Sequence, residues 1–222
     1  MRKLGVIFDL DGVIVDTAKY HFLAWKDLAD ELGFEFTETH NELLKGVSRV
    51  KSLEILLDIG NVKLSEEKKQ EFLITKNKEY LKYITKMGEE EILPGVKNLL
   101  DTLDELNIKY ALGSASKNAP LILKQVGLFD RFKAIVDGNH VSKAKPDPEV
   151  FLIGARKLNL LPADCIVFED AIAGIEAANK ANMISIGIGD RDTLNKADYN
   201  FNNLTEIPEH FFSGFLKEKI SK

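Results

Sequence analysis

The chain has 222 residues, of which 45% are hydrophobic and 29% charged, and its 35 acidic and 30 basic side chains give a net charge of −5. At about 150 residues per domain, this length suits one large domain or a core with a smaller insert. The apolar content excludes a disordered or fibrous chain. Because no block of basic residues is present, nucleic acid and membrane surfaces are excluded as expected partners.

The apolar runs and the cysteine content indicate where the protein acts. Runs such as residues 4–8 are far shorter than the roughly 18 residues of a membrane-spanning helix. No hydrophobic signal region follows Met1-Arg2-Lys3, and the single Cys165 cannot form an internal disulfide. We therefore expect a cytoplasmic protein. Because no heptad repeat or long apolar patch is evident, we expect a monomer.

The first structural element is a predicted buried strand over residues 4–8, which ends at Asp9-Leu10-Asp11-Gly12. No strong strand pattern returns until residue 109. Between them the periodicity is helical, over residues 17–32, 48–59 and 65–84. Connections in compact domains run to about 2–12 residues. Residues 16–92 are therefore predicted to form an α-helical cap inserted after the first strand.

Strands and helices alternate beyond this insert. Strands are expected near residues 109–113, 133–136, 164–168 and 183–187, and helices near 94–106, 117–126, 148–158 and 172–181. Asp147-Pro148 is predicted to start one helix, with the aspartate as N-cap. The alternation predicts an α/β fold in which residues 1–15 and 93–222 form the catalytic core, a Rossmann-like parallel sheet covered by helices. Ligands of such sheets bind beyond the carboxyl ends of the strands.

Polar side chains follow four of the predicted strands. They are Asp9 and Asp11, Ser114 and Ser116, Lys145, and Glu169 with Asp170. Each also has a structural explanation, because Asp-Gly forms turns, Ser116 and the acidic pair suit helix caps, and a lysine suits the surface. Four strand ends that all carry such groups nevertheless favour a shared site at one edge of the sheet.

This set of side chains suits phosphoryl transfer. A carboxylate such as Asp9 can attack phosphorus to form an acyl phosphate, and a second carboxylate two residues later can act as general acid and base. Asp9, Asp11 and Asp170 offer the oxygen ligands that Mg²⁺ prefers. Lys145 and Ser114 can balance the charge of the transferring group. The sequence contains no Walker loop, no His-Glu-x-x-His and no nucleophile elbow.

These four motifs, Asp9-Leu10-Asp11-Gly12-Val13, Ser114, Lys145-Pro146 and Glu169-Asp170, resemble those of the haloacid dehalogenase superfamily. The long insert after the first motif resembles the subclass with a helical cap in that position. The resemblance covers essentially the whole chain. It implies a core of the haloacid dehalogenase type and a phosphoprotein intermediate.

Segments in and beside the cap are similar to the β-phosphoglucomutase family within that superfamily: residues 16–22, 24–26, 44–49 and 114–118. The similarity implies Asp9 as nucleophile and Asp11 as general acid and base. It implies a Mg²⁺ site of Asp9, the backbone carbonyl of Asp11, Glu169 and Asp170. Ser114, Ala115 and Lys145 would contact the reacting phosphate, and Arg49, Ser116, Lys117 and Asn118 the distal one. The candidate substrate-binding set is Thr17, His21, Trp25, Gly46, Val47, Ser48, Arg49, Lys76, Ala115, Ser116, Lys117 and Asn118.

Periodicity gives an independent view of the cap. In the predicted helix 65–84, Lys76 lies within the apolar arc, either as a lysine whose stem covers apolar surface or as a contact to sugar or phosphate. His21 suits either a core histidine or a hydrogen-bonding neighbour of Asp11, and Trp25 is expected to pack. Ser48 is a predicted N-cap, after which Arg49 is favoured as a phosphate ligand. A cis Lys145-Pro146 bond is an open alternative, since about 5–6% of X-Pro bonds are cis.

The resemblance implies interconversion of β-D-glucose 1-phosphate and D-glucose 6-phosphate, with β-glucose 1,6-bisphosphate as intermediate and activator. A mutase needs a cap that excludes water and holds the non-reacting phosphate, as Arg49, Lys76, Ser116 and Asn118 would do. The alternative in the same superfamily is a Mg²⁺-dependent sugar-phosphate or phosphoglycolate-type phosphatase. A non-catalytic module that binds phosphosugars is third, and the presence of Asp9 counts against it.

Overall fold

The computed structural model describes residues 3–217 and contains a six-stranded parallel sheet. The strand order is β3-β2-β1-β4-β5-β6, so the first strand lies in the middle of the sheet. The predicted α/β fold is confirmed. The strands are β1 (Gly5–Phe8), β2 (Lys109–Gly113), β3 (Ala134–Val136), β4 (Cys165–Glu169), β5 (Ile184–Ile188) and β6 (Tyr199–Phe201).

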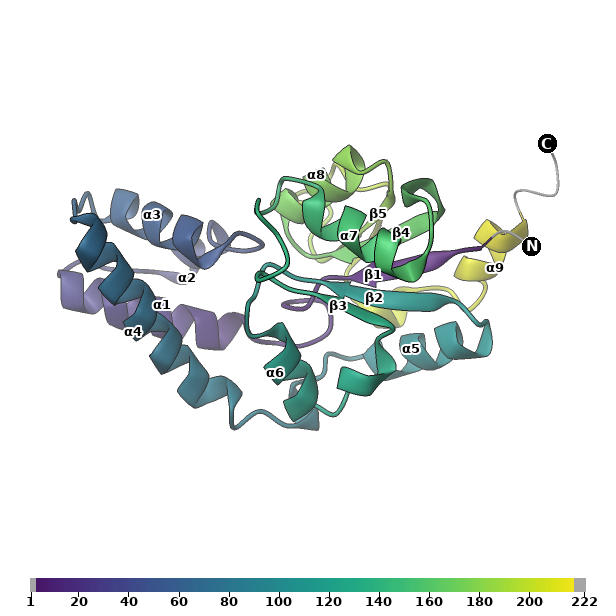
Figure 1. Cartoon of the computed structure of the whole chain (residues 1–222), viewed down its shortest axis with the longest axis horizontal. Coiled ribbons are helices and arrows are strands. Elements are labelled where there is room, and N and C mark those ends of the chain that lie inside the picture. The colour runs from purple at the N-terminus through teal and green to yellow at the C-terminus, as the bar shows by residue number, and fades with distance from the viewer. Residues whose placement is uncertain (1–2, 218–222) are drawn as a thin grey trace.

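Helices cover both faces of the sheet, which explains why the central strands are continuously apolar. Val6 and Phe8 of β1 pack into one core cluster with α5 (Val96–Glu105) and α6 (Ala119–Gln125). Ile7, which points to the other face, packs with α7 (Glu149–Leu158) and α8 (Ile172–Lys180). Figure 1 shows α7 and α8 above the sheet and α5 and α6 below it.

The inserted residues form a separate helical group at one end of the molecule (Figure 1). Its apolar core is built around Trp25, Phe36 and Leu56, all buried. Two chain segments join this group to the sheet, and they are tied together where the Leu93 N–H donates to Ile14 and the Asp16 N–H to Glu91. The helices are α1 (Ala18–Leu32), α2 (Glu38–Glu42), α3 (Arg49–Ile59) and α4 (Glu66–Ile84).

The structure adds short elements that the sequence pattern missed: α2, β6 and α9 (Phe211–Lys217). It also corrects one helix start, because Pro148 and not Asp147 occupies the N-cap position of α7. The Asp147 carboxylate still accepts a hydrogen bond from the Glu149 N–H at 3.0 Å. The limits predicted for cap and core remain predictions, and their outermost residues, 1–2 and 218–222, lie outside the described part of the chain.

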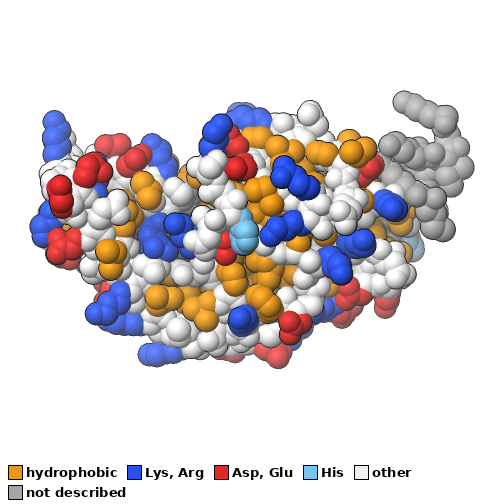
Figure 2. All heavy atoms as spheres, viewed as in Figure 1, with side chains coloured by type: hydrophobic (Ala, Val, Ile, Leu, Met, Phe, Trp, Pro, Cys, Tyr) orange, Lys and Arg blue, Asp and Glu red, His pale blue; other side chains and the backbone are white. Residues whose placement is uncertain are grey.

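The surface carries both signs of charge in close mixture. Figure 2 shows lysine and arginine side chains interspersed with acidic ones over the face in view. Surface charges also pair along single helices, as in the 2.6 Å contacts of Lys26 with Asp30 and of Lys69 with Glu66. Between residues 3 and 217, no helix combines the length and the apolar character needed to cross a bilayer.

Candidate active site

Three carboxylates meet where two central strands end. Asp9 directly follows β1, Glu169 is the last residue of β4, and Asp170 follows it. Parallel pairing of β1 with β4 aligns these ends, and the Asp9 N–H donates to the Phe168 carbonyl at 2.9 Å. One ligand atom from each carboxylate lies within 4.8 Å of the other two. The predicted convergence of Asp9, Glu169 and Asp170 is therefore present.

Lys145 is the cation of this cluster. Its Nζ atom lies 2.5 Å from Asp9 Oδ1 and 2.6 Å from Glu169 Oε1, and its side chain is only 1% exposed. Burial alone would lower the pKa of Lys145, but the two carboxylates outweigh it and raise that pKa above its ordinary value. The lysine is thus fixed in its charged form. The Lys145-Pro146 bond is cis.

The remaining negative charge suits a divalent cation. Burial raises the pKa of Glu169 to about 7, with Lys145 opposing and Asp9 adding to the rise. Burial, followed by the charges of Glu169 and Asp9, raises the pKa of Asp170 well above its ordinary value. Burial and mutual repulsion both disfavour the charged forms of these carboxylates, and a bound cation would offset both effects. Carboxylate oxygens are the hard donors that Mg²⁺ selects. The donor set fits the Mg²⁺ that the predicted site requires.

Gly12 makes room for Asp170 in this cluster. Its φ of +77° lies in the left-handed region, and a Cβ there would overlap the Asp170 carboxylate. The Asp-Gly turn is therefore needed by the site as well as by the backbone.

Asp11 occupies a different environment from its neighbours. The Thr17 hydroxyl donates to Asp11 Oδ1, and His21 Nε2 lies 4.0 Å from the same oxygen. Burial, followed by the Asp9 charge, raises the pKa of Asp11 to about 6, although the Thr17 hydrogen bond opposes the rise. A carboxyl group with such a pKa can both give and accept a proton near neutral pH. Its side chain suits the predicted acid and base role.

The inward-facing lysine of α4 is buried rather than extended to solvent. Lys76 is 2% exposed, and its Nζ lies 2.9 Å from His21 Nδ1. The same Nζ lies 4.6 Å from the ring centroids of Trp25 and Tyr80. Burial, followed by the Arg49 charge, lowers the pKa of Lys76 well below its ordinary value. The interpretation of Lys76 as a lysine that reaches solvent along its stem is wrong.

Tyr80 is a neighbour that sequence reasoning did not single out as part of the site. Its ring stacks on His21 with 4.2 Å between centroids, and the residue is 1% exposed. The available signal was its position one helical turn after Lys76, on the same face of α4. Its contact with His21, which is 59 positions earlier, depends on how α1 and α4 pack.

The segment before α3 brings Arg49 to the site. Ser48 is the N-cap, as predicted, and its hydroxyl accepts from the Lys51 N–H at 3.3 Å. Arg49 begins the helix, and burial lowers its pKa. Gly46 has a φ of +71°, and a Cβ at this position would come within 2.7 Å of Ala171 Cβ. The cap segment thus passes closely over the start of α8.

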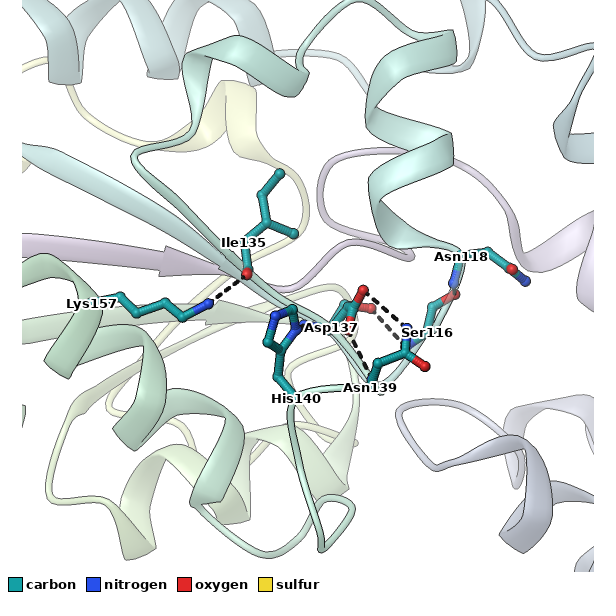
Figure 3. A network of polar contacts seen from close by, with 8 residues as sticks. Ser116, Asn118, Ile135, Asp137, Asn139, His140 and Lys157 are labelled. Atoms are coloured by element: carbon teal, nitrogen blue, oxygen red, sulfur yellow. Dashed lines mark hydrogen bonds and ion pairs between the residues drawn. The ribbon is translucent and has the colours of Figure 1, made fainter.

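Residues 114–118 form a compact loop beyond β2. The Ser114 hydroxyl accepts from the Ser116 N–H at 3.0 Å, and the Ser116 hydroxyl accepts from the Asn118 N–H at 3.2 Å. Asn118, and not Ser116, is the N-cap residue of α6. Figure 3 shows this loop beside Asp137, whose Oδ1 accepts from the Asn139 N–H at 2.8 Å.

A cavity of about 530 Å³ joins the carboxylate cluster to the inserted helices. Two of the predicted residues, Thr17 and Glu169, are fully buried and are not part of its lining. Thr17 donates a hydrogen bond to Asp11, and Glu169 pairs with Lys145. Among lining residues that were not predicted are Ser52, Gln70, Asn77 and Tyr80. The predicted residues that line it are Asp9, Asp11, His21, Trp25, Gly46, Val47, Ser48, Arg49, Lys76, Ser114, Ala115, Ser116, Lys117, Asn118, Lys145 and Asp170.

Comparisons with known proteins agree with this geometry. A family model described as haloacid dehalogenase-like hydrolase matches residues 6–188. A β-phosphoglucomutase of Bacillus subtilis (strain 168) is 47% identical over 196 residues, which cover 87% of each chain. The crystal structure of a β-phosphoglucomutase from Clostridium difficile is similar with a TM-score of 0.93 and 41% identity, over 99% of this chain and 100% of that one. A phosphorylated carbohydrates phosphatase of Thermotoga maritima is 32% identical over 181 residues, 81% of this chain and 82% of that protein.

Proposed function

Within the haloacid dehalogenase-like hydrolase family, to which this chain belongs, we propose that it acts as a β-phosphoglucomutase. The reaction interconverts β-D-glucose 1-phosphate and D-glucose 6-phosphate. The observation that carries the proposal is the cavity, whose walls hold Asp9 and Lys145 together with Arg49 and Asn118. Such a cavity offers groups for two phosphates on one sugar.

Asp9 and Asp11 perform the group transfer in this proposal. A carboxylate oxygen of Asp9 attacks the phosphorus at the 1-position of β-glucose 1,6-bisphosphate, the bond between phosphorus and the sugar oxygen breaks, and Asp11 gives its proton to that departing oxygen, which releases glucose 6-phosphate. In the second half-reaction the 6-hydroxyl of β-glucose 1-phosphate attacks the aspartyl phosphate, the bond between phosphorus and Asp9 breaks to restore the carboxylate, and the hydroxyl proton passes to Asp11, so that β-glucose 1,6-bisphosphate forms. The pKa of about 6 lets Asp11 serve in both directions.

The surrounding charges hold the reacting phosphate. Lys145 faces Asp9 and is positioned to balance the added negative charge, while Ser114 is buried beside the same strand ends. Asp9, the Asp11 carbonyl, Glu169 and Asp170 would hold Mg²⁺, which would supply two further positive charges to balance those of the phosphate.

The far side of the cavity holds the non-reacting phosphate. Arg49 presents a planar fork of donors, and the loop of Ser116, Lys117 and Asn118 adds further donors. β-Glucose 1,6-bisphosphate is the intermediate, and after it is formed it turns so that its other phosphate faces Asp9. The cavity must therefore accept a phosphate at either end.

A phosphatase is the second candidate, supported by the 32% identity to the Thermotoga maritima enzyme that acts on phosphorylated carbohydrates. Both activities begin with transfer to Asp9. They differ in whether water or a sugar hydroxyl takes the phosphoryl group from the aspartate. A cavity that excludes water favours the sugar.

A paired assay decides between the two. Purified protein receives Mg²⁺, β-glucose 1-phosphate and a trace of glucose 1,6-bisphosphate, and one channel follows glucose 6-phosphate while the other follows free phosphate. We expect glucose 6-phosphate to form well ahead of phosphate, and Asp9→Asn to abolish both. Release of phosphate alone would refute the mutase and leave the phosphatase.

The assembly and location of the protein are also proposals. We expect a monomer that acts in the cytoplasm, activated by the bisphosphate. Sedimentation measurements test the monomer, and omission of the bisphosphate from the paired assay tests activation, which should appear as a lag before glucose 6-phosphate forms.

A further inference from the structure

A hydrogen bond at the wall of the cavity joins α4 to the loop beyond β2. Asn118 Nδ2 donates to Asn77 Oδ1 at 3.0 Å. Asn77 lies on α4 of the inserted helices, whereas Asn118 precedes α6 of the sheet core, 41 positions later in the chain. Both residues line the cavity and are partly buried. The bond therefore joins the two sides of the molecule at the wall of the substrate cavity.

On the core side, the Asn118 loop is held by further hydrogen bonds. The Asn118 N–H donates to the Ser116 hydroxyl at 3.2 Å, and the Ser116 carbonyl accepts from the Gly138 N–H at 3.4 Å. Gly138 follows Asp137, which is 3% exposed and lies 2.8 Å from His140 Nδ1 (Figure 3). Asn77 thus contacts a loop that is already fixed to the sheet.

The chemistry of the amide gives this contact a consequence. A side-chain amide has two N–H donors and one carbonyl acceptor. When Asn77 Oδ1 accepts one N–H of Asn118, the orientation of the whole amide plane is fixed. The second N–H then has a defined direction, which a phosphate oxygen in the cavity can use.

We propose that Asn77 is a positioning residue that acts through Asn118. Its carbonyl oxygen orients the Asn118 amide toward the non-reacting phosphate and ties the inserted helices to the loop that binds it. This inference rests on the proposed function. Retention of the distal phosphate and exclusion of water both require the inserted helices to stay against the core. Both therefore depend on the contact between Asn77 and Asn118.

A double-mutant cycle tests the proposal. Asn77→Ala, Asn118→Ala and the double variant are made in the full chain with Asp9→Asn, so that affinity for glucose 6-phosphate is measured by calorimetry with Mg²⁺ and without turnover. Each single variant should weaken binding about fivefold, the ratio typical for one neutral hydrogen bond. The double variant should bind as weakly as Asn118→Ala alone. Thr75→Ala, an exposed position of the same helix, is the matched control and should bind like the parent.

A second measurement uses the variants with Asp9 restored. In the paired assay, Asn77→Ala should raise the ratio of phosphate released to glucose 6-phosphate formed, and raise KM more than it lowers kcat. A structural defect alone would lower thermal stability and leave this ratio unchanged.

The outcomes separate the two proposals. If the Asp9→Asn parent does not bind glucose 6-phosphate, the proposed function fails. If the parent binds but the losses from Asn77→Ala and Asn118→Ala add in the double variant, Asn77 does not act through Asn118. Parent-like affinity of Asn77→Ala also overturns the inference.

Discussion

Substitution of Lys145 by methionine tests how the carboxylate cluster is stabilised. Lys145 Nζ lies 2.5 Å from Asp9 and 2.6 Å from Glu169, with 1% or less of the Lys145 and Glu169 side chains exposed. Methionine keeps most of the length of the stem but removes the charge. Two buried carboxylates then lose their shared cation, in a cluster that already contains Asp170.

The expected loss is large because one partner of a buried ion pair is removed and the other is left uncompensated. Such changes cost about 3–5 kcal/mol, against a total stability of about 5–15 kcal/mol for a typical domain. Mg²⁺ should recover part of this loss, since it binds the same carboxylates in the folded chain. At a hundred times its Kd, a ligand adds about 2.7 kcal/mol.

Urea unfolding with and without Mg²⁺ measures both effects. Lys143→Met is the matched control, because Lys143 is two positions away with its side chain 72% exposed and lies 3.7 Å from Asp147. It should change the free energy of unfolding by less than about 0.5 kcal/mol. If Lys145→Met is as stable as Lys143→Met in the absence of Mg²⁺, the described role of Lys145 is wrong.

Three further predictions concern other single side chains. Asp11→Asn should lower kcat by a factor of about 10²–10⁴, the usual contribution of a general acid and base. Its Mg²⁺ affinity, measured by calorimetry, should be nearly unchanged, and a large loss of that affinity would contradict the proposal that Asp11 holds Mg²⁺ through its backbone carbonyl. Arg49→Lys should weaken binding of the bisphosphate about tenfold in the same type of titration, since lysine cannot bridge two oxygens, and unchanged affinity would place Arg49 outside the phosphate site. Burial raises the pKa of Cys165 from 9.0 to about 12, so the folded chain holds that proton more tightly than the unfolded one. Stability should therefore fall as pH rises above 9, by up to about 1.4 kcal/mol per pH unit, and Cys165→Ala should reduce this slope in urea unfolding; an identical slope would contradict the assignment.

Much of the fold follows from local patterns. The buried strands are visible because helices on both faces require continuous apolar runs, and the strand ends then bring Asp9 and Glu169 together through parallel pairing. β6 was missed because none of its three residues is buried and its pairing with β5 is not local. The pattern of residues 199–201 carries no burial signal.

Contacts across the cavity were harder to predict. Periodicity placed Lys76 on the inner face of its helix, but it did not show that Nζ meets His21 rather than solvent. Asn77 gave no signal at all, because its partner Asn118 belongs to the sheet core. Such pairs depend on how the inserted helices dock on the core, which no local pattern specifies.

The two buried lysines differ in what balances their charge, and this difference predicts opposite effects on stability. Carboxylates raise the pKa of Lys145 above its ordinary value, whereas Lys76 faces His21 and aromatic rings, and burial followed by the Arg49 charge lowers its pKa. A lowered lysine pKa means that folding opposes the charge, so at neutral pH the charged form of Lys76 costs stability until an anion binds nearby.

Lys76→Met should therefore leave the free chain about as stable as wild type or slightly more stable, in contrast to Lys145→Met. The same substitution should weaken binding of glucose 6-phosphate, because the cavity loses a cation that forms no ion pair with a carboxylate among residues 3–217. Urea unfolding without ligand and calorimetric titration with glucose 6-phosphate measure the two quantities. A loss of about 3 kcal/mol or more in the free energy of unfolding of the free chain would contradict this reasoning, because Lys76 would then stabilise the fold before any anion binds.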